Sequence, residues 1–459
     1  MKIAHFSDLH YSPDRLTESD RCFGFAVEHA IGNGVDVAVI SGDATDHRLD
    51  AHSPALNALA RRVHQLAAAM PVVMLQGTFS HEPPGTLSNF ALMGSVHEIY
   101  IADRIRQVAL CDGRFVTSAG AVFSETELEG LLSGRPDAVF TCLPTINRGQ
   151  LAANVGALAV ATDLGDVLAR YLLASGEVNA RLRSLGVRTV GMSHGTVNGC
   201  TTEHGVTMAG FDHEFSIGAL FDASCDAFML GHIHKMQQWT REGRTVAYPG
   251  SIGRFHYGET GDKGYLLWDI EPGRADASLV VTPSREMVSI EFDGPPDMER
   301  LAELAARSAD GFVRVRWQLD EEHRQSVDRD AIRTMFGAAA DLKLEPRIVP
   351  VVRSRAQGIS LETTVQAKLH RWCELASVDA SSVLDRLQLL ETGDADSIAA
   401  SVLAGIDGTP APATVTDTLA CVGSDVQTLV SDPMACVAPV STGASSTALS
   451  WLEDDLFAA

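Results

Sequence analysis

Five short groups of residues in the first part of the chain carry side chains suited to metal-dependent hydrolysis. They are Asp8-Leu9-His10, Gly42-Asp43-Ala44-Thr45-Asp46, Gly77-Thr78-Phe79-Ser80-His81, Ser193-His194-Gly195 and Gly231-His232-Ile233-His234. Carboxylate and imidazole groups together are typical ligands of manganese, iron and zinc. Each group alone is a weak signal, because a Gly-Asp pair or a single histidine usually belongs to an ordinary turn. All five in this order predict one shared site for divalent metal ions.

Each group follows a short apolar run that we expect to form a buried strand. These runs are Lys2–Phe6, Val35–Ile40, Pro71–Leu75, Thr189–Met192 and Phe228–Leu230. Helical periodicity covers Asp20–Ile31 and Pro54–Ala69, and this alternation of strands and helices is typical of a layered α/β domain. Open α/β sheets place their sites at the carboxyl ends of their strands. We therefore expect an α/β fold with the five groups gathered at one edge.

The order of the groups resembles the pattern of the calcineurin-like metallophosphoesterase family, which is Asp-x-His, Gly-Asp-x-x-Asp, Gly-Asn-His-Asp/Glu, a lone His and Gly-His-x-His. The resemblance covers about the first 270 residues. It implies a layered β-sandwich flanked by helices, with two metal ions at one edge. It also assigns the ligands of both ions: Asp8, His10 and His234 for the first, His194 and His232 for the second, and Asp43 for both.

The chemistry that the resemblance implies is hydrolysis of a phosphate ester. Two cations about 3.5–4 Å apart neutralise the phosphodiester oxygens and activate a bridging water for in-line attack. His81 is not a ligand, and in the family this histidine faces the leaving oxygen, so we predict that it is a general acid. Asp46 and Arg254 are predicted to be catalytic as well. Manganese is the expected metal, because the ligand set contains no thiolate.

The third group departs from the family pattern. The asparagine that normally lends an oxygen to the second metal is missing, Ser80 stands before His81, and the group is two residues longer. We predict that Ser80 supplies the missing ligand, with Thr78 as the alternative. A hydroxyl is a weaker ligand, so the second metal should bind less tightly. Loss of activity is the competing interpretation.

A second stretch indicates which kind of phosphoesterase this is. Tyr248-Pro-Gly-Ser-Ile-Gly-Arg254-Phe-His-Tyr-Gly-Glu259 resembles a segment of the SbcD-type nucleases of double-strand-break repair. The segment Gly311–Arg316 more weakly resembles their capping domain. The resemblance implies a DNA exo/endonuclease, the nuclease subunit of an SbcCD-like complex. The alternatives are a stand-alone phosphodiesterase acting on a small nucleotide, and a weakly active scaffold that binds DNA and an ATPase.

A small group of arginines is the predicted DNA-binding surface. Arg314 and Arg316 alternate along an expected strand, so both side chains point to one face. Arg353 and Arg355 follow in a segment with few acids. An ordinary solvated charged face is an equally good interpretation. The formal net charge is −23, so DNA contacts are local, a partner supplies them, or the substrate is not a nucleic acid.

Changes in composition divide the chain into four predicted parts. These are a nuclease domain at 1–293, a capping domain at 294–358, a helical partner-docking segment at 359–404 and a flexible acidic tail at 405–459. By resemblance, the helical segment docks on an SbcC-type coiled-coil ATPase, and helices near Asp50–Arg61 form a homodimer. The segment Trp451–Phe457 is a candidate docking peptide, with a frayed chain terminus as the alternative.

The remaining features point to a cytoplasmic protein without a membrane partner. The sequence has no run of about 18 apolar residues and no signal peptide at its start. Its eight cysteines are scattered and form no Cys-x-x-Cys pair, as in reduced intracellular proteins.

Overall fold

The computed structural model describes residues 1–407, except for 94, 146–156, 203–213, 260 and 351–357. Arg353, Arg355, Trp451–Phe457 and nearly all of the predicted tail therefore lie outside the described residues. The chain divides into two compact units. The first contains Met1–Leu319 and His323–Ile348, and the second contains the helices that follow Val349.

A six-stranded sheet forms one layer of the first unit. Its order is β15 (Arg274–Val281), β14 (Gly264–Glu271), β1 (Lys2–Phe6), β2 (Val37–Ile40), β3 (Val72–Leu75) and β4 (Ile99–Ala102). The strands β1 to β4 pair in parallel, whereas β14 and β15 are antiparallel. Parallel pairing brings the ends of β1, β2 and β3 to the same edge.

A seven-stranded sheet forms the second layer. Its order is β12 (Gln237–Arg241), β13 (Arg244–Tyr248), β11 (Ala227–Gly231), β8 (Arg188–His194), β7 (Ala138–Leu143), β5 (Arg106–Cys111) and β6 (Arg114–Thr117). The strands β7, β8, β11 and β13 run parallel at its centre. The short strands β9 (Thr196–Val197) and β10 (Glu214–Phe215) form a separate pair.

The two sheets pack face to face, and their central strands β2, β3, β7 and β11 are buried on both sides. Ile3 and Val39 of the first sheet share a core with Phe140 and Met192 of the second. Phe6 lies on the other face of the first sheet, in the core that this face forms with helices. Alternate side chains of a strand point to opposite faces, so a strand with both faces buried must be apolar throughout. This explains why continuous apolar runs marked these strands.

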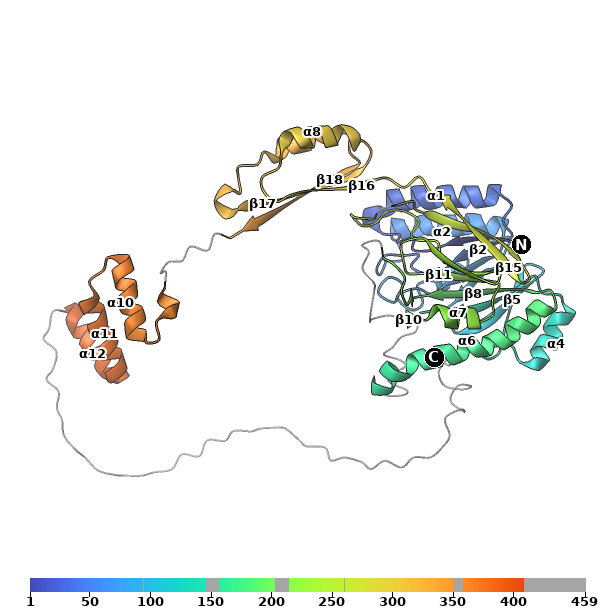
Figure 1. Cartoon of the computed structure of the whole chain (residues 1–459), viewed down its shortest axis with the longest axis horizontal. Coiled ribbons are helices and arrows are strands. Elements are labelled where there is room, and N and C mark those ends of the chain that lie inside the picture. The colour runs from blue at the N-terminus through green and yellow to red at the C-terminus, as the bar shows by residue number, and fades with distance from the viewer. Residues whose placement is uncertain (94, 146–156, 203–213, 260, 351–357, 408–459) are drawn as a thin grey trace, which may run out of the picture. The chain divides into compact units, whose positions relative to one another are not determined.

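Helices cover the outer faces of the sandwich (Figure 1). They are α1 (Leu16–Gly32) and α2 (Pro54–Ala69) on the first sheet, and α4 (Glu125–Ser133), α6 (Ala157–Ser184) and α7 (Ile217–Asp222) on the second. Short turns add η1 (Pro13–Arg15) and α3 (Ser88–Ala91). The predicted α/β class, a layered sandwich flanked by helices, is confirmed.

A small α/β subdomain follows the sandwich. Its sheet contains β16 (Met287–Phe292), β17 (Phe312–Asp320) and β18 (Asp341–Val349), with helices α8 (Met298–Arg307) and α9 (Arg329–Met335) and the turn η2 (Glu321–His323). Trp317, Val315 and Leu301 are buried in its core. Because β16 pairs with β17, this sheet begins before the predicted boundary at 294.

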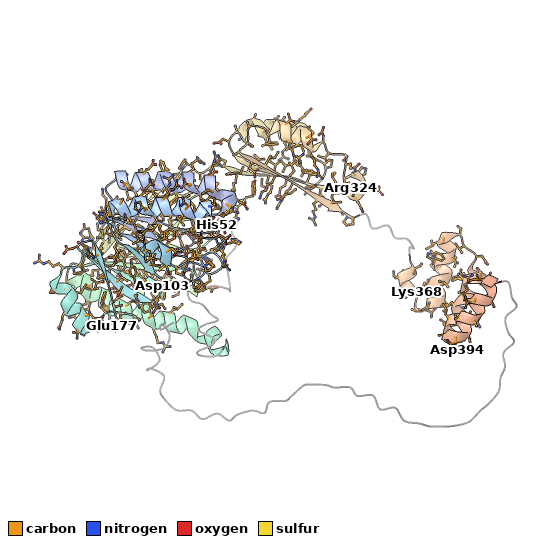
Figure 2. All side chains as sticks on the ribbon, turned by 180° about the vertical axis from the view of Figure 1, so that it is seen from behind. His52, Asp103, Glu177, Arg324, Lys368 and Asp394 are labelled. Carbon is orange, nitrogen blue, oxygen red and sulfur yellow. The ribbon has the colours of Figure 1, made fainter. Side chains whose placement is uncertain are left out.

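Three helices make up the described part of the second unit. They are α10 (Val365–Ala376), α11 (Ala380–Thr392) and α12 (Ala395–Asp407), preceded by the turn η3 (Ile359–Leu361). Figure 2 shows their side chains, with Lys368 and Asp394 labelled. Cys373 is buried, whereas Leu361 and Leu390 stay exposed. The helical segment is confirmed. None of the described helices combines the length and apolar character needed to cross a bilayer.

Candidate metal centre

The ends of β1, β2, β8 and β11 bring the predicted ligands to one edge of the sandwich. The loops after β1 and β2 run side by side, because the amide of Asp8 donates to the carbonyl of Gly42 (3.1 Å). Gly231 pairs with His194 between β11 and β8, which places His232 beside His194. Several residues here have a positive φ angle, namely Asp8, His10, Asp43 and His232. Such strained backbone is held in place by its surroundings and is common at functional sites.

The first ligand group consists of Asp8, His10 and His234. The Nε2 atoms of the two histidines are 2.9 Å apart, and each is within 4 Å of Asp8 Oδ1 (3.9 and 3.8 Å). Burial lowers the pKa of His10, which favours the neutral imidazole that binds metals. Among the described residues, buried Asp8 Oδ1 has no hydrogen-bond partner. An orphaned carboxylate oxygen facing two converging imidazole nitrogens fits a divalent cation.

The second ligand group consists of Asp43, His194 and His232. Asp43 Oδ2 lies 3.2 Å from His194 Nε2, and the other ring nitrogen of His194 is 2.8 Å from the carbonyl oxygen of Ser41. A hydrogen bond from Nδ1 to that carbonyl turns Nε2 toward Asp43, as expected of a metal ligand. Burial lowers the pKa of His194, but the Asp43 carboxylate raises it to about 10. Metal binding here must therefore displace a proton.

Thr78, not Ser80, is the hydroxyl that lies beside the second group. Its Oγ1 is 3.2 Å from Asp43 Oδ2 and 3.3 Å from His194 Nε2. The amides of His81 and Glu82 both donate to the carbonyl of Thr78 (2.9 and 2.7 Å), so residues 78–82 form a tight turn. The two extra residues of this group are taken up by that turn. The role of Ser80 as a ligand stays a prediction, and the geometry favours the alternative, Thr78.

Glu82 holds two of the site loops together, a role that sequence reasoning missed. Its side chain is fully buried, and its two carboxylate oxygens accept from the amides of Ala44 and Gly77. Burial raises the pKa of Glu82 to about 7. The signal available in the sequence was its place directly after His81. Gly77 must be glycine here, because a Cβ atom would lie 2.4 Å from Asp43 Oδ1.

His81 lies at the open side of the first group, together with Asp46. Its Nδ1 is 3.0 Å from Asp46 Oδ1, and its ring meets that of His10 edge-on at 4.9 Å. The hydrogen bond with Asp46 raises the pKa of His81. Burial would raise the pKa of Asp46, but hydrogen bonds from His10 and His81 outweigh burial and hold it well below its usual range. The pair can present a protonated imidazole to a bound phosphate ester.

Glu259 orients His234 through the ring nitrogen that does not face the metal site. The His234 Nδ1 atom lies 3.0 Å from Glu259 Oε1, and Lys263 Nζ lies 3.1 Å from Glu259 Oε2. Burial would raise the pKa of Glu259, but His234 and Lys263 lower it to about 2. A carboxylate that accepts from the second ring nitrogen of a ligand histidine fixes its orientation and tautomer. The sequence contained a signal for this role, since Glu259 ends the Tyr-Pro-Gly-Ser stretch.

Arg254 makes contacts that hold the backbone together. Its guanidinium donates to the carbonyls of Gly261 (2.7 Å), Ser284 (3.1 Å) and Arg285 (3.3 Å), and it lies 3.4 Å from Glu286 in an ion pair. Its side chain is nearly buried. These contacts join the loop after β13 to the connection between β15 and β16. They favour a structural role, and the catalytic role of Arg254 stays a prediction.

The predicted DNA-binding arginines have different surroundings. Arg314 lies 4.6 Å from the centre of the Tyr257 ring and bonds to Ser289. Arg316 is neutralised locally, because it pairs with Glu345 (2.7 Å) and Glu291 (3.5 Å). Sequence alternation correctly indicated one face for both, but it carried no information about the acids on neighbouring strands.

One comparison with known proteins, a local sequence match, bears on this site. No family model matches the chain. Over 84 residues, 18% of this chain, it is 39% identical to the "uncharacterized metallophosphoesterase YhaO" of Bacillus subtilis (strain 168). That match spans 19% of the relative's own length.

Two solved structures each align with 62% of this chain at a TM-score of 0.38. One is a dimetal phosphatase from Danio rerio, 13% identical and covered over 99% of its length. The other is GAP50 of Plasmodium, described as the anchor in the inner membrane complex, 11% identical and covered over 85%. The sequence match and the two groups of aspartate and histidine ligands together support a metallophosphoesterase-type hydrolase that uses divalent metal ions.

Proposed function

We propose that this chain is a metal-dependent DNA nuclease that cleaves phosphodiester bonds with two divalent ions, manganese in the first instance. The observation that carries the proposal is the pair of adjoining ligand groups. Asp8 connects them, because its Oδ1 faces His10 and His234 while its Oδ2 accepts from the amide of His232 (3.1 Å). Two bound divalent ions would supply a nucleophilic water and neutralise the phosphodiester oxygens.

The residues of the chain supply orientation and a proton. Asp46 holds His81 through Nδ1, which leaves Nε2 available to donate a proton to the leaving oxygen. Because the pKa of His81 is raised, the imidazole is protonated over a wider pH range and can act as the acid. Glu259 holds His234 and the carbonyl of Ser41 holds His194, so both ligands keep one orientation throughout the reaction.

DNA is the proposed substrate, and two basic side chains beside an aromatic ring support it. Arg314 and Lys343 of the small sheet lie 4.6 and 5.8 Å from the ring centre of Tyr257, two residues before Glu259. Cations next to an aromatic ring suit a phosphate backbone and its bases. Arg316, paired with two acids, contributes less than its position in the sequence suggests. We propose that a partner supplies further positive charge, because the chain has a net charge of −23.

Partner docking is proposed on the second unit. Its helices expose Leu361, Val365 and Leu390 (83%, 58% and 64% exposed), an apolar surface that a coiled-coil ATPase of the SbcC type would cover. The test is co-purification of this chain with a coiled-coil ATPase of the SbcC type. Replacement of Leu390 by Glu should abolish the complex and leave cleavage of small phosphodiesters unchanged. A complex that survives this replacement would contradict docking through α11.

The test of the nuclease proposal is digestion of an end-labelled duplex with manganese. His81→Ala should lower the rate at least a hundredfold, since general acid catalysis contributes roughly 10²–10⁴-fold. The matched control is His64→Ala, because His64 is an exposed histidine on α2. Digestion of dinucleotides but not of duplex DNA, with the ATPase present, would favour the small-nucleotide alternative. Absence of cleavage with every divalent ion would overturn the proposal and leave the scaffold interpretation.

A further inference from the structure

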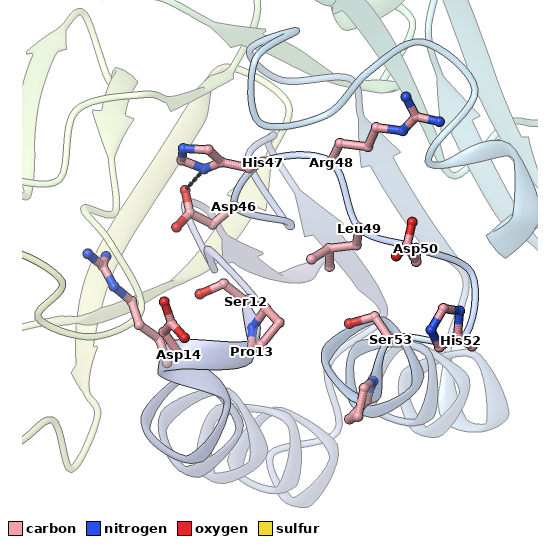
Figure 3. A pocket seen from close by; sticks show the side chains of 12 residues that line it. Ser12, Pro13, Asp14, Asp46, His47, Arg48, Leu49, Asp50, His52 and Ser53 are labelled. Atoms are coloured by element: carbon pink, nitrogen blue, oxygen red, sulfur yellow. Dashed lines mark hydrogen bonds and ion pairs between the residues drawn. The ribbon is translucent and has the colours of Figure 1, made fainter.

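A surface cavity of about 510 Å³ has Asp46, the partner of the proposed general acid, in its wall (Figure 3). Its walls come from the turn before α1 and from the loop between β2 and α2, and they include Ser12, Asp46, His47, Leu49 and Ser53. The cavity adjoins the site through Asp46, because the same oxygen, Oδ1, bonds to His81 Nδ1 (3.0 Å) and to His47 Nδ1 (2.8 Å).

One wall residue has an unused hydrogen-bonding group. Ser53 is 7% exposed, and its Oγ has no hydrogen-bond partner among the described residues. Ser53 is also the N-cap residue of α2, where a serine hydroxyl normally accepts from an amide of the first helical turn. Here that bond is not made. In Figure 3 the Ser53 oxygen turns toward the space between Leu49 and Ser12. A buried polar group needs a partner, and in this position a bound molecule would supply it.

The lining of the cavity favours a neutral, partly apolar molecule over a second phosphate. Asp14, Asp46 and Asp50 line it together with Arg15 and Arg48, so neither sign of charge dominates. Two prolines and Leu49 offer apolar surface, and His47 and His52 offer flat rings with nitrogen donors and acceptors. A nucleobase with its sugar has the same combination of a flat ring and hydrogen-bonding edges, and it fits within a cavity of this size.

We infer that this cavity binds the nucleoside on the leaving side of the scissile phosphodiester, with Ser53 as a residue that recognises it. The inference rests on the proposed function, because His81 marks the leaving side only if it protonates the leaving oxygen. His47 connects the cavity to the proposed general acid, since its ring meets that of His81 edge-on, with 5.4 Å between the ring centres. A substrate whose phosphate lies at the metal ligands would reach the cavity across Asp46 and His47.

The test compares two substrates, thymidylyl-(3′→5′)-thymidine and bis(p-nitrophenyl) phosphate, of which the second has no nucleoside. Ser53→Ala should lower the ratio of kcat/KM for the first over the second by about 3- to 10-fold, the effect of one hydrogen bond. Ser53→Thr keeps the hydroxyl and should keep the ratio. The matched control is Ser19→Ala, because Ser19 also has a buried hydroxyl without a partner among the described residues but does not line the cavity. An unchanged ratio in Ser53→Ala would overturn the inference.

A second measurement separates this inference from the proposed function. Saturation-transfer NMR with thymidine on the metal-free protein reports binding without catalysis. We expect a signal that weakens in Ser53→Ala and persists in Ser19→Ala. If no divalent ion supports cleavage of either substrate, the proposed function fails, and this signal still decides whether the cavity holds a nucleoside. Absence of thymidine binding by the unsubstituted protein would overturn the cavity assignment.

Discussion

Replacement of Glu259 by Gln tests how the first metal ligand group is held. Glu259 accepts three hydrogen bonds, from His234 Nδ1 on Oε1 and from the Phe255 amide and Lys263 on Oε2 (3.0, 3.0 and 3.1 Å). An amide accepts on only one side. With its oxygen placed toward Phe255 and Lys263, its NH2 group faces His234 Nδ1. The histidine must then accept at Nδ1, which puts its proton on Nε2.

The changed tautomer directs an N–H group at the place where the metal should bind. Loss of a partner behind a ligand histidine typically lowers metal affinity 10- to 100-fold. This corresponds to about 1.4–2.7 kcal/mol of binding free energy. Folding should also weaken, because Glu259 and Lys263 are both buried, at 0% and 2% side-chain exposure, and breaking a buried ion pair costs about 3–5 kcal/mol.

The assay is a manganese titration by calorimetry under conditions where circular dichroism shows the variant to be folded. The affinity of the step assigned to Asp8, His10 and His234 should fall 10- to 100-fold. The affinity of the step assigned to Asp43, His194 and His232 should change little. The control is Glu242→Gln, because Glu242 is 75% exposed and far less constrained. If Glu259→Gln binds manganese as the unsubstituted protein does, the positioning role of Glu259 is wrong.

Three further predictions concern single contacts. Thr78→Ala should weaken the second metal step about tenfold, roughly 1.4 kcal/mol, in a manganese titration, and a larger effect of Ser80→Ala would show that the hydroxyl ligand is Ser80 instead. The hydrogen bond from Arg62 lowers the pKa of Asp20 in the folded protein. The pair therefore stabilises the fold fully above the pKa of the unfolded state, about 3.9, and this stabilisation is lost as the pH falls through the lowered pKa of the folded state. Asp20→Asn should therefore reduce urea stability by about 0.5–1 kcal/mol at pH 6 and by less at pH 3, and an equal loss at both would refute this. Trp317→Ala should destabilise the small sheet by about 3–5 kcal/mol in calorimetry, because Trp317 fills its core, and a loss below 1 kcal/mol would contradict that packing.

Some structural features of this chain follow from short stretches of its sequence. The strands were predictable because burial on both faces demands an unbroken apolar run, as in Val72–Leu75. The helices α1 and α2 were predictable from their periodicity and from the Gly-Asn-Gly sequence that ends α1. The boundary before the small sheet was less accessible, since β16 belongs to that sheet only through its pairing with β17. Pairing between distant segments leaves little trace in either one alone.

By itself, the sequence determined the type of site, since aspartate and histidine residues that follow parallel strands must meet at one edge. It did not determine which further groups complete or support that site. Thr78 rather than Ser80 lies beside the second group, and Glu259 rather than Arg254 contacts a ligand, because a turn and a loop bring them there. Such roles depend on contacts between residues far apart in the chain. The availability of a charged side chain depends on the fold in the same way, because Glu345 on a neighbouring strand pairs with Arg316. Only the tertiary structure decided these points.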